Sequence, residues 1–236
     1  MRVINNAIIY SAVTVLKNGI GFFLLPLYTA FLTPADYGIV GIITSMTRFL
    51  SVIMLLAMHG AGTRFHYTIA KNGGKLELLW GTVYAFVLLN GLFVTVLLAA
   101  THRYVVEPFF DNIPFYPYLL LGILISFFQA GYQIYHSYLR TTQDGRRVGI
   151  LDFSIFVVKL TLTVGLVVIF DMKAVGVILA LAVTQFAFFV IGFFNLKPMA
   201  AILPASVHAP DFPSRRKPSI PKSPSVRMAI SSRLLR

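Results

Sequence analysis

The chain contains no cysteine, which excludes disulfide scaffolds, thiolate zinc sites, iron–sulfur clusters and cysteine nucleophiles together. Its five histidines show neither an HExxH pattern nor close pairing, so the sequence predicts no metal site. It also lacks the GxxxxGKS/T loop of P-loop ATPases, the GxGxxG turn of dinucleotide-binding domains and the GxSxG turn of serine hydrolases. We therefore expect no cofactor and no ATP-driven motor in this chain.

Charged residues are scarce. Only 12% of the 236 residues are charged, whereas ordinary soluble domains have about 25%. Apolar and aromatic residues make up 57%, and the mean hydropathy is +0.79. Because a soluble domain of this length cannot bury that much apolar surface, the composition predicts an integral membrane protein.

Six apolar stretches are long enough to cross a bilayer, which takes about 20 residues in a helix. They are continuously apolar and do not alternate, so they predict helices rather than the strands of a β-barrel. The expected fold class is an all-α polytopic membrane protein with about six transmembrane helices. The predicted spans are approximately Ile8–Leu32, Tyr37–Met58, Leu78–Ala100, Phe115–Leu139, Gly149–Phe170 and Ala174–Phe194.

Positive charge is the second unusual feature, with 20 Lys and Arg residues against 8 Asp and Glu and a formal net charge of +12. In a soluble protein this excess would suggest a nucleic-acid partner. Here the connections between spans alternate between basic and nearly neutral, as the preference of Lys and Arg for the cytoplasmic side requires. We therefore expect both termini in the cytoplasm and no nucleic-acid partner. The basic connections contain Arg2, Arg64, Lys71, Lys75, Arg140, Arg146, Arg147 and Lys197.

The composition changes near the C-terminus. We expect a six-helix transmembrane domain over residues 1–200 and a disordered basic tail over residues 205–236. The tail holds five of the twelve prolines, seven serines and seven of the twenty Lys and Arg residues, so it cannot bury enough apolar surface to fold alone. Two interpretations stay open: a cytoplasmic arm attracted to anionic lipid, or an aberrant end such as a frameshift product.

The connection between the first two spans has the residue types of a helix start. Thr33 can cap, Pro34 suits the first helical position, and Asp36 can return a hydrogen bond to the cap. The second span should then begin directly after the first. Pro26 lies within the first span and should kink it. Since proline is common in membrane helices, Pro26 is either an ordinary feature of such a helix or the hinge of a bending one.

Three cations lie inside predicted spans: Lys17, Arg48 and Lys159. A charge at the centre of a bilayer costs roughly 2.5–3.5 kcal/mol, and each of these cations sits on a polar stripe at helical spacing. The fourth span has a polar stripe of its own without a central charge, so four helices can turn polar faces toward a common interior. The pattern predicts a water-filled cavity lined by cations, which suits an anionic substrate. The alternative is that the cations pair between helices or extend to lipid headgroups.

Other polar residues extend this hypothesis. Gln129 and Gln133 lie on the fourth span and either line the same cavity or hold helices together through hydrogen bonds. Arg64 and Arg140 lie in basic connections. They are most simply signals of topology, but they could also contact a phosphate group that enters from the cytoplasm.

The segments Pro26-Leu27-Tyr28-Thr29 and Leu32-Thr33-Pro34-Ala35-Asp36-Tyr37-Gly38 resemble the opening of polysaccharide-biosynthesis membrane proteins. These form the O-antigen flippase group of the multidrug/oligosaccharidyl-lipid/polysaccharide exporter superfamily. The resemblance covers about residues 1–200. It implies a multi-pass transporter of the bacterial inner membrane, with two helical lobes that alternate access. Such a transporter moves oligosaccharides, carried on undecaprenyl pyrophosphate, to the outer leaflet, and the pyrophosphate would occupy the cation-lined cavity.

The six predicted spans correspond to one lobe of such a transporter. We therefore expect that the reading frame is truncated and that the protein acts with a second lobe or as a homodimer. Transport would be driven by an ion gradient or the membrane potential. Three alternatives remain: a membrane enzyme of lipid-linked glycan assembly, a drug/cation antiporter of the same superfamily, and a nonfunctional fragment. An enzyme is not expected, because the longest external loop, about Thr101–Pro114, is short for a catalytic domain. Asp152 is the sole candidate for an antiporter's coupling acid.

Overall fold

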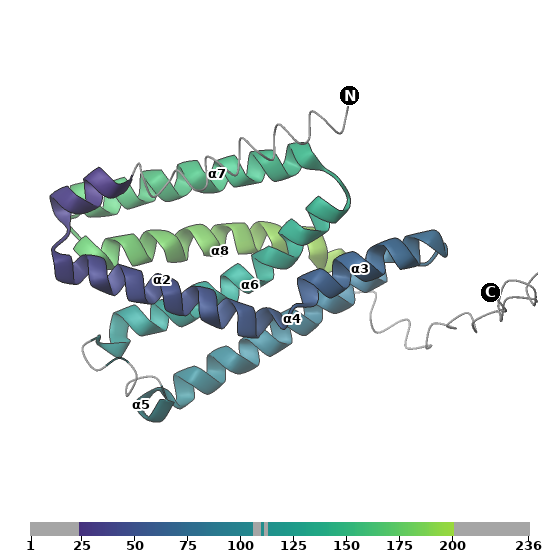
Figure 1. The fold of residues 1–236 in the computed structure, drawn as a ribbon, viewed down its shortest axis with the longest axis horizontal. Helices are drawn as coiled ribbons and strands as arrows, with labels where there is room; N and C mark the ends of the chain where they lie inside the picture. Colours follow the sequence, from purple (N-terminus) through teal and green to yellow (C-terminus); the bar gives the residue numbers. More distant parts are fainter. Residues whose placement is uncertain (1–23, 106–109, 111–112, 201–236) are drawn as a thin grey trace, which may run out of the picture. The chain divides into compact units, whose positions relative to one another are not determined.

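The computed structural model describes residues 24–105, 110 and 113–200 of the chain. Within these ranges all regular structure is helical, as the sequence predicts. Residues 24–31 are helical and lead into the helices that are labelled in Figure 1. These helices are α2 (Pro34–Leu55), α3 (Met58–Lys71), α4 (Leu76–Ala100), α5 (His102–Val105), α6 (Leu120–Thr141), α7 (Gly145–Val164) and α8 (Lys173–Ala200), with the π-helical turns η2 (Phe115–Leu119) and η3 (Gly165–Ile169).

Five helical segments of the described chain are long and apolar enough to cross a membrane. They coincide with the second to sixth predicted spans, so the all-α polytopic fold is confirmed. The predicted first span falls mostly on residues 8–23, outside the described part, and so does the predicted tail over residues 205–236; a total of six spans therefore stays a prediction. The five segments are Pro34–Leu55, Leu76–Ala100, Phe115–Thr141, Gly145–Ile169 and Lys173–Leu196.

The start of α2 confirms the predicted cap. The Thr33 hydroxyl accepts a hydrogen bond from the Asp36 backbone N–H at 3.2 Å, and the Asp36 carboxylate accepts one from the Thr33 N–H at 3.1 Å. Pro34 occupies the first turn, where its missing N–H costs nothing. Only Leu32 and Thr33 separate α2 from the helical residues 24–31, so α2 begins directly after the preceding helical segment, as the sequence predicts.

Helix α3 was not predicted. Residues 58–71 were expected to belong to a connection, and the second span was expected to continue to Met58. The structure instead ends α2 at Leu55, because Leu56 and Ala57 adopt φ angles of 43° and 56° in the left-handed region. A right-handed helix cannot continue through that conformation, and the chain restarts as α3. Because this helix mixes polar and apolar residues, it contains no long apolar run that would have predicted it.

Helix α6 occupies the middle of the described bundle, in contact with α2, α3, α4, α7 and α8. Two of its glycines allow neighbours to come close. A Cβ atom at Gly122 would lie 2.5 Å from Met46 Cε of α2, and one at Gly131 would lie 2.6 Å from the Phe189 ring of α8. Small residues at such crossings let membrane helices pack through van der Waals contact, so these two positions set how tightly α6 is held.

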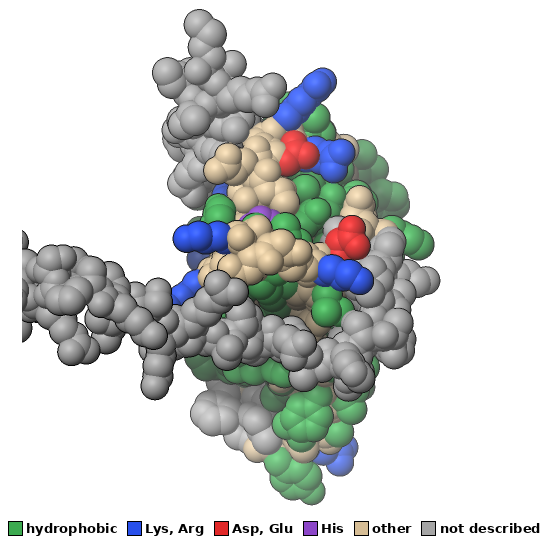
Figure 2. All heavy atoms as spheres, turned by 90° about the vertical axis from the view of Figure 1, so that its right-hand side faces the viewer, with side chains coloured by type: hydrophobic (Ala, Val, Ile, Leu, Met, Phe, Trp, Pro, Cys, Tyr) green, Lys and Arg blue, Asp and Glu red, His purple; other side chains and the backbone are tan. Residues whose placement is uncertain are grey.

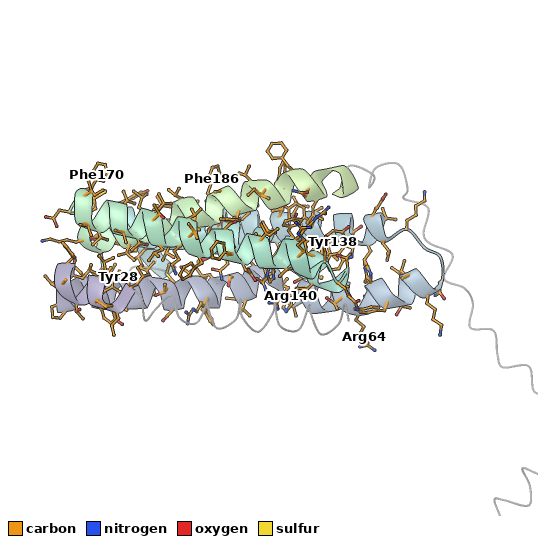
Figure 3. The ribbon with its side chains drawn as sticks, turned by 90° about the horizontal axis from the view of Figure 1, so that it is seen from above. Tyr28, Arg64, Tyr138, Arg140, Phe170 and Phe186 are labelled. Atoms are coloured by element: carbon orange, nitrogen blue, oxygen red, sulfur yellow. The ribbon has the colours of Figure 1, made fainter. Side chains whose placement is uncertain are left out.

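The connections of the bundle separate into two ends (Figure 1). One end carries the α3–α4 turn and the α6–α7 connection, and six of the eleven Lys and Arg residues of the described chain lie in the α3–α4 turn, on α3 or on the ends of α6 and α7 beside these connections. Figure 2 looks onto this basic end, and Lys and Arg side chains lie on several sides of it. In Figure 3, Arg64 and Arg140 lie toward this end, whereas Tyr28 and Phe170 lie toward the other. The alternation of basic and neutral connections therefore corresponds to two ends of one bundle.

Candidate functional site

Two of the three predicted membrane cations influence one another in the folded chain. Arg48 of α2 is exposed, and Lys159 of α7 is half-buried. The charge of Arg48 acts on Lys159 through space, although 110 residues of sequence lie between them. Neither makes an ion pair with an acid in the part of the chain that the structure describes. Lys17, the third predicted cation, lies outside the described residues.

The depth of these cations follows from helix geometry. At a rise of about 1.5 Å per residue, Lys159 lies roughly 21 Å from Gly145 and 15 Å from Ile169, the two ends of its span. Arg48 lies about 10 Å from Leu55, which ends α2. Lys159 is therefore too deep to be a simple interfacial anchor, and Arg48 lies between it and the basic end. We name these two residues the cation pair.

Arg64 and Arg140 belong to the basic end rather than to the cation pair. Arg64 lies on α3 and Arg140 in the last turn of α6, and both are exposed. Their sequence neighbours connect the two helices, because the hydroxyls of Thr63 and Thr141 lie 3.1 Å apart in a hydrogen bond. The two arginines are therefore held on adjacent helices at one end of the bundle (Figure 3).

The two predicted glutamines lie on the central helix of the bundle. Gln129 and Gln133 are half-buried on α6, and among the described residues neither makes a hydrogen bond to another side chain or to the cation pair. The Gln185 side-chain oxygen on α8 is buried without a hydrogen-bond partner in the same part of the chain. Pro26 lies within the helical residues 24–31, but the helix that it was expected to kink continues outside the described region.

An aromatic cluster fixes α3 at the basic end. The Trp80 indole N–H donates a hydrogen bond to His66 Nδ1 at 3.1 Å, and Trp80 is fully buried. Gly62 of α3 lies against the Trp80 ring, where a Cβ atom would approach to 3.1 Å. The Tyr138 ring of α6 meets the same indole edge to face, with ring centroids 5.5 Å apart. Because α3 is held by these contacts, Arg64 has a defined place at the basic end.

The contact between His136 and Asp152 was not predicted from the sequence. His136 Nε2 of α6 lies 3.2 and 3.3 Å from the two carboxylate oxygens of Asp152 on α7, and the residues are only 4% and 1% exposed. Each lies a similar number of residues from the connection between α6 and α7. In an antiparallel hairpin such residues face one another, so this spacing was the signal that could have revealed the pair.

A shallow groove on α2 is separate from the cation pair. It has a volume of about 420 Å³ and includes neither Arg48 nor Lys159. Its walls are largely apolar, so it does not supply the polar cavity predicted from the sequence. The lining residues are Gly41, Ile42, Ser45, Met46, Phe49 and Phe110.

The described fold defines a multi-pass helical membrane protein. No family model matches the chain, and comparison with curated proteins and with solved structures gives no match either. The flippase resemblance therefore rests on the residues quoted for it and stays a prediction.

Proposed function

We propose that this protein is one lobe of a flippase-type transporter that moves lipid-linked oligosaccharides across the bacterial inner membrane. Its substrate would be an oligosaccharide on undecaprenyl pyrophosphate, with the anionic headgroup held by Arg48 and Lys159 and by Lys17 of the first span. The observation that carries this proposal is the cation pair: two positive side chains, from helices distant in sequence, within electrostatic range of one another at membrane depth.

The energetics of the cation pair favour an anionic ligand. An exposed Arg on a spanning helix must face water or another protein, because facing lipid costs several kcal/mol. Arg48 and Lys159 also repel one another, so an anion bound to both relieves that repulsion. A pyrophosphate carries the charge and the oxygen acceptors that Arg and Lys bind well.

The basic end supplies an entry for this headgroup. Arg64 and Arg140 lie at that end (Figure 3). Arg48 lies about 10 Å along α2 from Leu55, the last residue of that helix, and Lys159 lies about 21 Å along α7 from Gly145. The headgroup would pass from the two arginines to the cation pair while its lipid tail stays in the bilayer. Closure against a second lobe or a second copy would then reverse access, and an ion gradient or the membrane potential would supply direction.

A drug/cation antiporter is the second candidate function. Such a protein needs an acid within the membrane to bind the coupling ion, and Asp152 is buried on α7 beside His136. The cation pair does not suit a cationic drug, since like charges repel. We therefore rank the flippase first.

The direct test is deletion of the gene in its own host, followed by analysis of surface glycan and of the lipid-linked units. We expect surface glycan to disappear and lipid-linked oligosaccharide to accumulate in the cytoplasmic leaflet, with both restored by the wild-type gene. Loss of a polymerase or ligase would instead leave finished units accessible in the outer leaflet. Normal glycan on the deletion strain would contradict the proposal.

A further inference from the structure

The contact between His136 and Asp152 is deeply buried, with the two side chains only 6% and 1% exposed. It joins α6 to α7 through the imidazole Nε2 and both carboxylate oxygens. Asp152 is eight residues into the span that begins at Gly145, and His136 is five residues before Thr141. Both residues therefore lie inside the bundle, about two helical turns from the basic end.

The protonation of this pair decides its net charge. Neutral His136 beside the Asp152 carboxylate carries one negative charge, whereas one added proton makes the pair neutral overall. A second proton would leave a positive charge. Because a net charge in a low-dielectric interior is costly, the pair holds one proton firmly unless neighbouring charges stabilise the unprotonated form.

Neighbouring cations provide that stabilisation. Arg140 and Asp152 both act electrostatically on the buried Tyr132 hydroxyl, so the guanidinium lies within range of the pair. Lys159 is two helical turns from Asp152 on α7, about 10 Å along the axis. On α8, no titratable residue lies between Ala174 and Leu196. The remaining titratable or charged groups on the elements that contact α6, and on α6 itself, are Tyr135 and Tyr138 of α6, Asp144, Arg146 and Arg147 at the start of α7, His59, Arg64, His66, Tyr67 and Lys71 of α3, Asp36, Tyr37 and Arg48 of α2, Glu77 and Tyr84 of α4, Tyr116 and Tyr118 of η2, and Lys173 and Lys197 of α8.

We propose that His136 and Asp152 form a proton-binding site between α6 and α7. One proton from water joins the pair and is shared between imidazole Nε2 and the carboxylate, and it returns to water when the pair unloads. The site uses residues distinct from the cation pair. Its link to anion binding rests on the proposed function, whereas proton binding itself does not.

The link follows from electrostatics. An anion bound at Arg140 or Lys159 cancels the positive potential that stabilises the unprotonated pair, so anion binding and proton uptake favour one another. Linkage makes this effect reciprocal. A proton bound at the pair would in turn strengthen retention of the anion.

Nuclear magnetic resonance of the full chain, labelled with ¹⁵N in histidine and reconstituted in phosphatidylcholine vesicles, tests the site. The His136 signals are assigned by their loss in His136→Gln, and His59→Gln on α3 is the matched control because His59 is exposed. The His136 ring signals should respond to pH, because the proposed site takes up and releases a proton. In Asp152→Asn the charged form should be at least tenfold less populated at the acidic end.

Three results would overturn the proton site: a His136 ring that keeps one protonation state throughout, a titration identical in wild type and Asp152→Asn, or signals that respond to sodium chloride and not to pH. The spectra need no transported substrate, so they can support the site even if the flippase proposal fails. In a weakly buffered solution, inorganic pyrophosphate should then cause proton uptake by the wild type and not by Asp152→Asn. Absence of that uptake, with a titrating His136, would count against the pyrophosphate substrate alone.

Discussion

Replacing both Arg48 and Lys159 with alanine should reduce glycan export about a hundredfold, with about tenfold for each single change. The reason is the strength of hydrogen bonds to charged groups, roughly 1.5–3 kcal/mol each, where about 1.4 kcal/mol corresponds to a factor of ten. The measurement is the amount of surface glycan restored when each variant is expressed in the deletion strain. Arg48→Lys keeps the charge and should retain more export than Arg48→Ala.

The matched control is Arg103→Ala. Arg103 is also an exposed arginine, but it lies on α5, in the connection at the other end of the bundle from Arg64 and Arg140. Its removal should leave export within about twofold of wild type, since a surface substitution away from a special contact changes stability by less than about 0.5 kcal/mol. Wild-type export by the double variant, at equal expression, would show that the cation pair does not hold the substrate.

Enlarging Gly131 should have the largest effect on folding. A Cβ atom there would lie 2.6 Å from both Cδ2 and Cε2 of Phe189. The Phe189 ring is itself packed against Phe127 and Phe128 of α6, at centroid distances of 5.6 and 5.4 Å. The ring has little room to move, so Gly131→Ala should lower the free energy of unfolding by about 1–3 kcal/mol, and Gly131→Leu should prevent accumulation of folded protein.

Unfolding in mixed detergent micelles, followed by circular dichroism, measures this effect. Gly41→Ala is the control, because a Cβ atom at Gly41 of α2 meets nothing within 4 Å. That change should be neutral or stabilising by up to about 1 kcal/mol, as expected for alanine in a helix. Phe189→Leu should recover part of the stability lost in Gly131→Ala. Equal stability of Gly131→Ala and wild type would mean that α6 and α8 do not pack as described.

The spans were predictable because each depends on local composition. Long apolar runs predicted both ends of α4 to within two residues and the start of α8 to within one residue, although α8 continues to Ala200. The side chains of Thr33 and Asp36 were sufficient to predict where α2 begins. A cap and an apolar run are encoded within a few neighbouring residues. The fold class therefore required no knowledge of which helix lies beside which.

Contacts between helices were harder to predict. The break at Leu56 and Ala57 has no glycine to signal left-handed backbone, so α3 was missed. The proximity of Arg48 and Lys159 depends on how α2 and α7 are arranged in three dimensions, which periodicity alone does not determine. The contact between His136 and Asp152 could have been predicted, because a short connection joins α6 to α7 and determines which residues of the two helices face each other.

The central claim is that the cation pair faces water at membrane depth, and thiol accessibility tests it most directly. The chain has no cysteine, so Arg48→Cys, Lys159→Cys and the control Leu89→Cys each carry a single thiol. Leu89 is 69% exposed in the middle of α4, where its apolar side chain should face lipid. We predict that a membrane-impermeant thiol reagent modifies the cysteines at positions 48 and 159 at least tenfold faster than the one at 89. Equal, slow modification of all three in intact membranes would contradict a water-filled, cation-lined path.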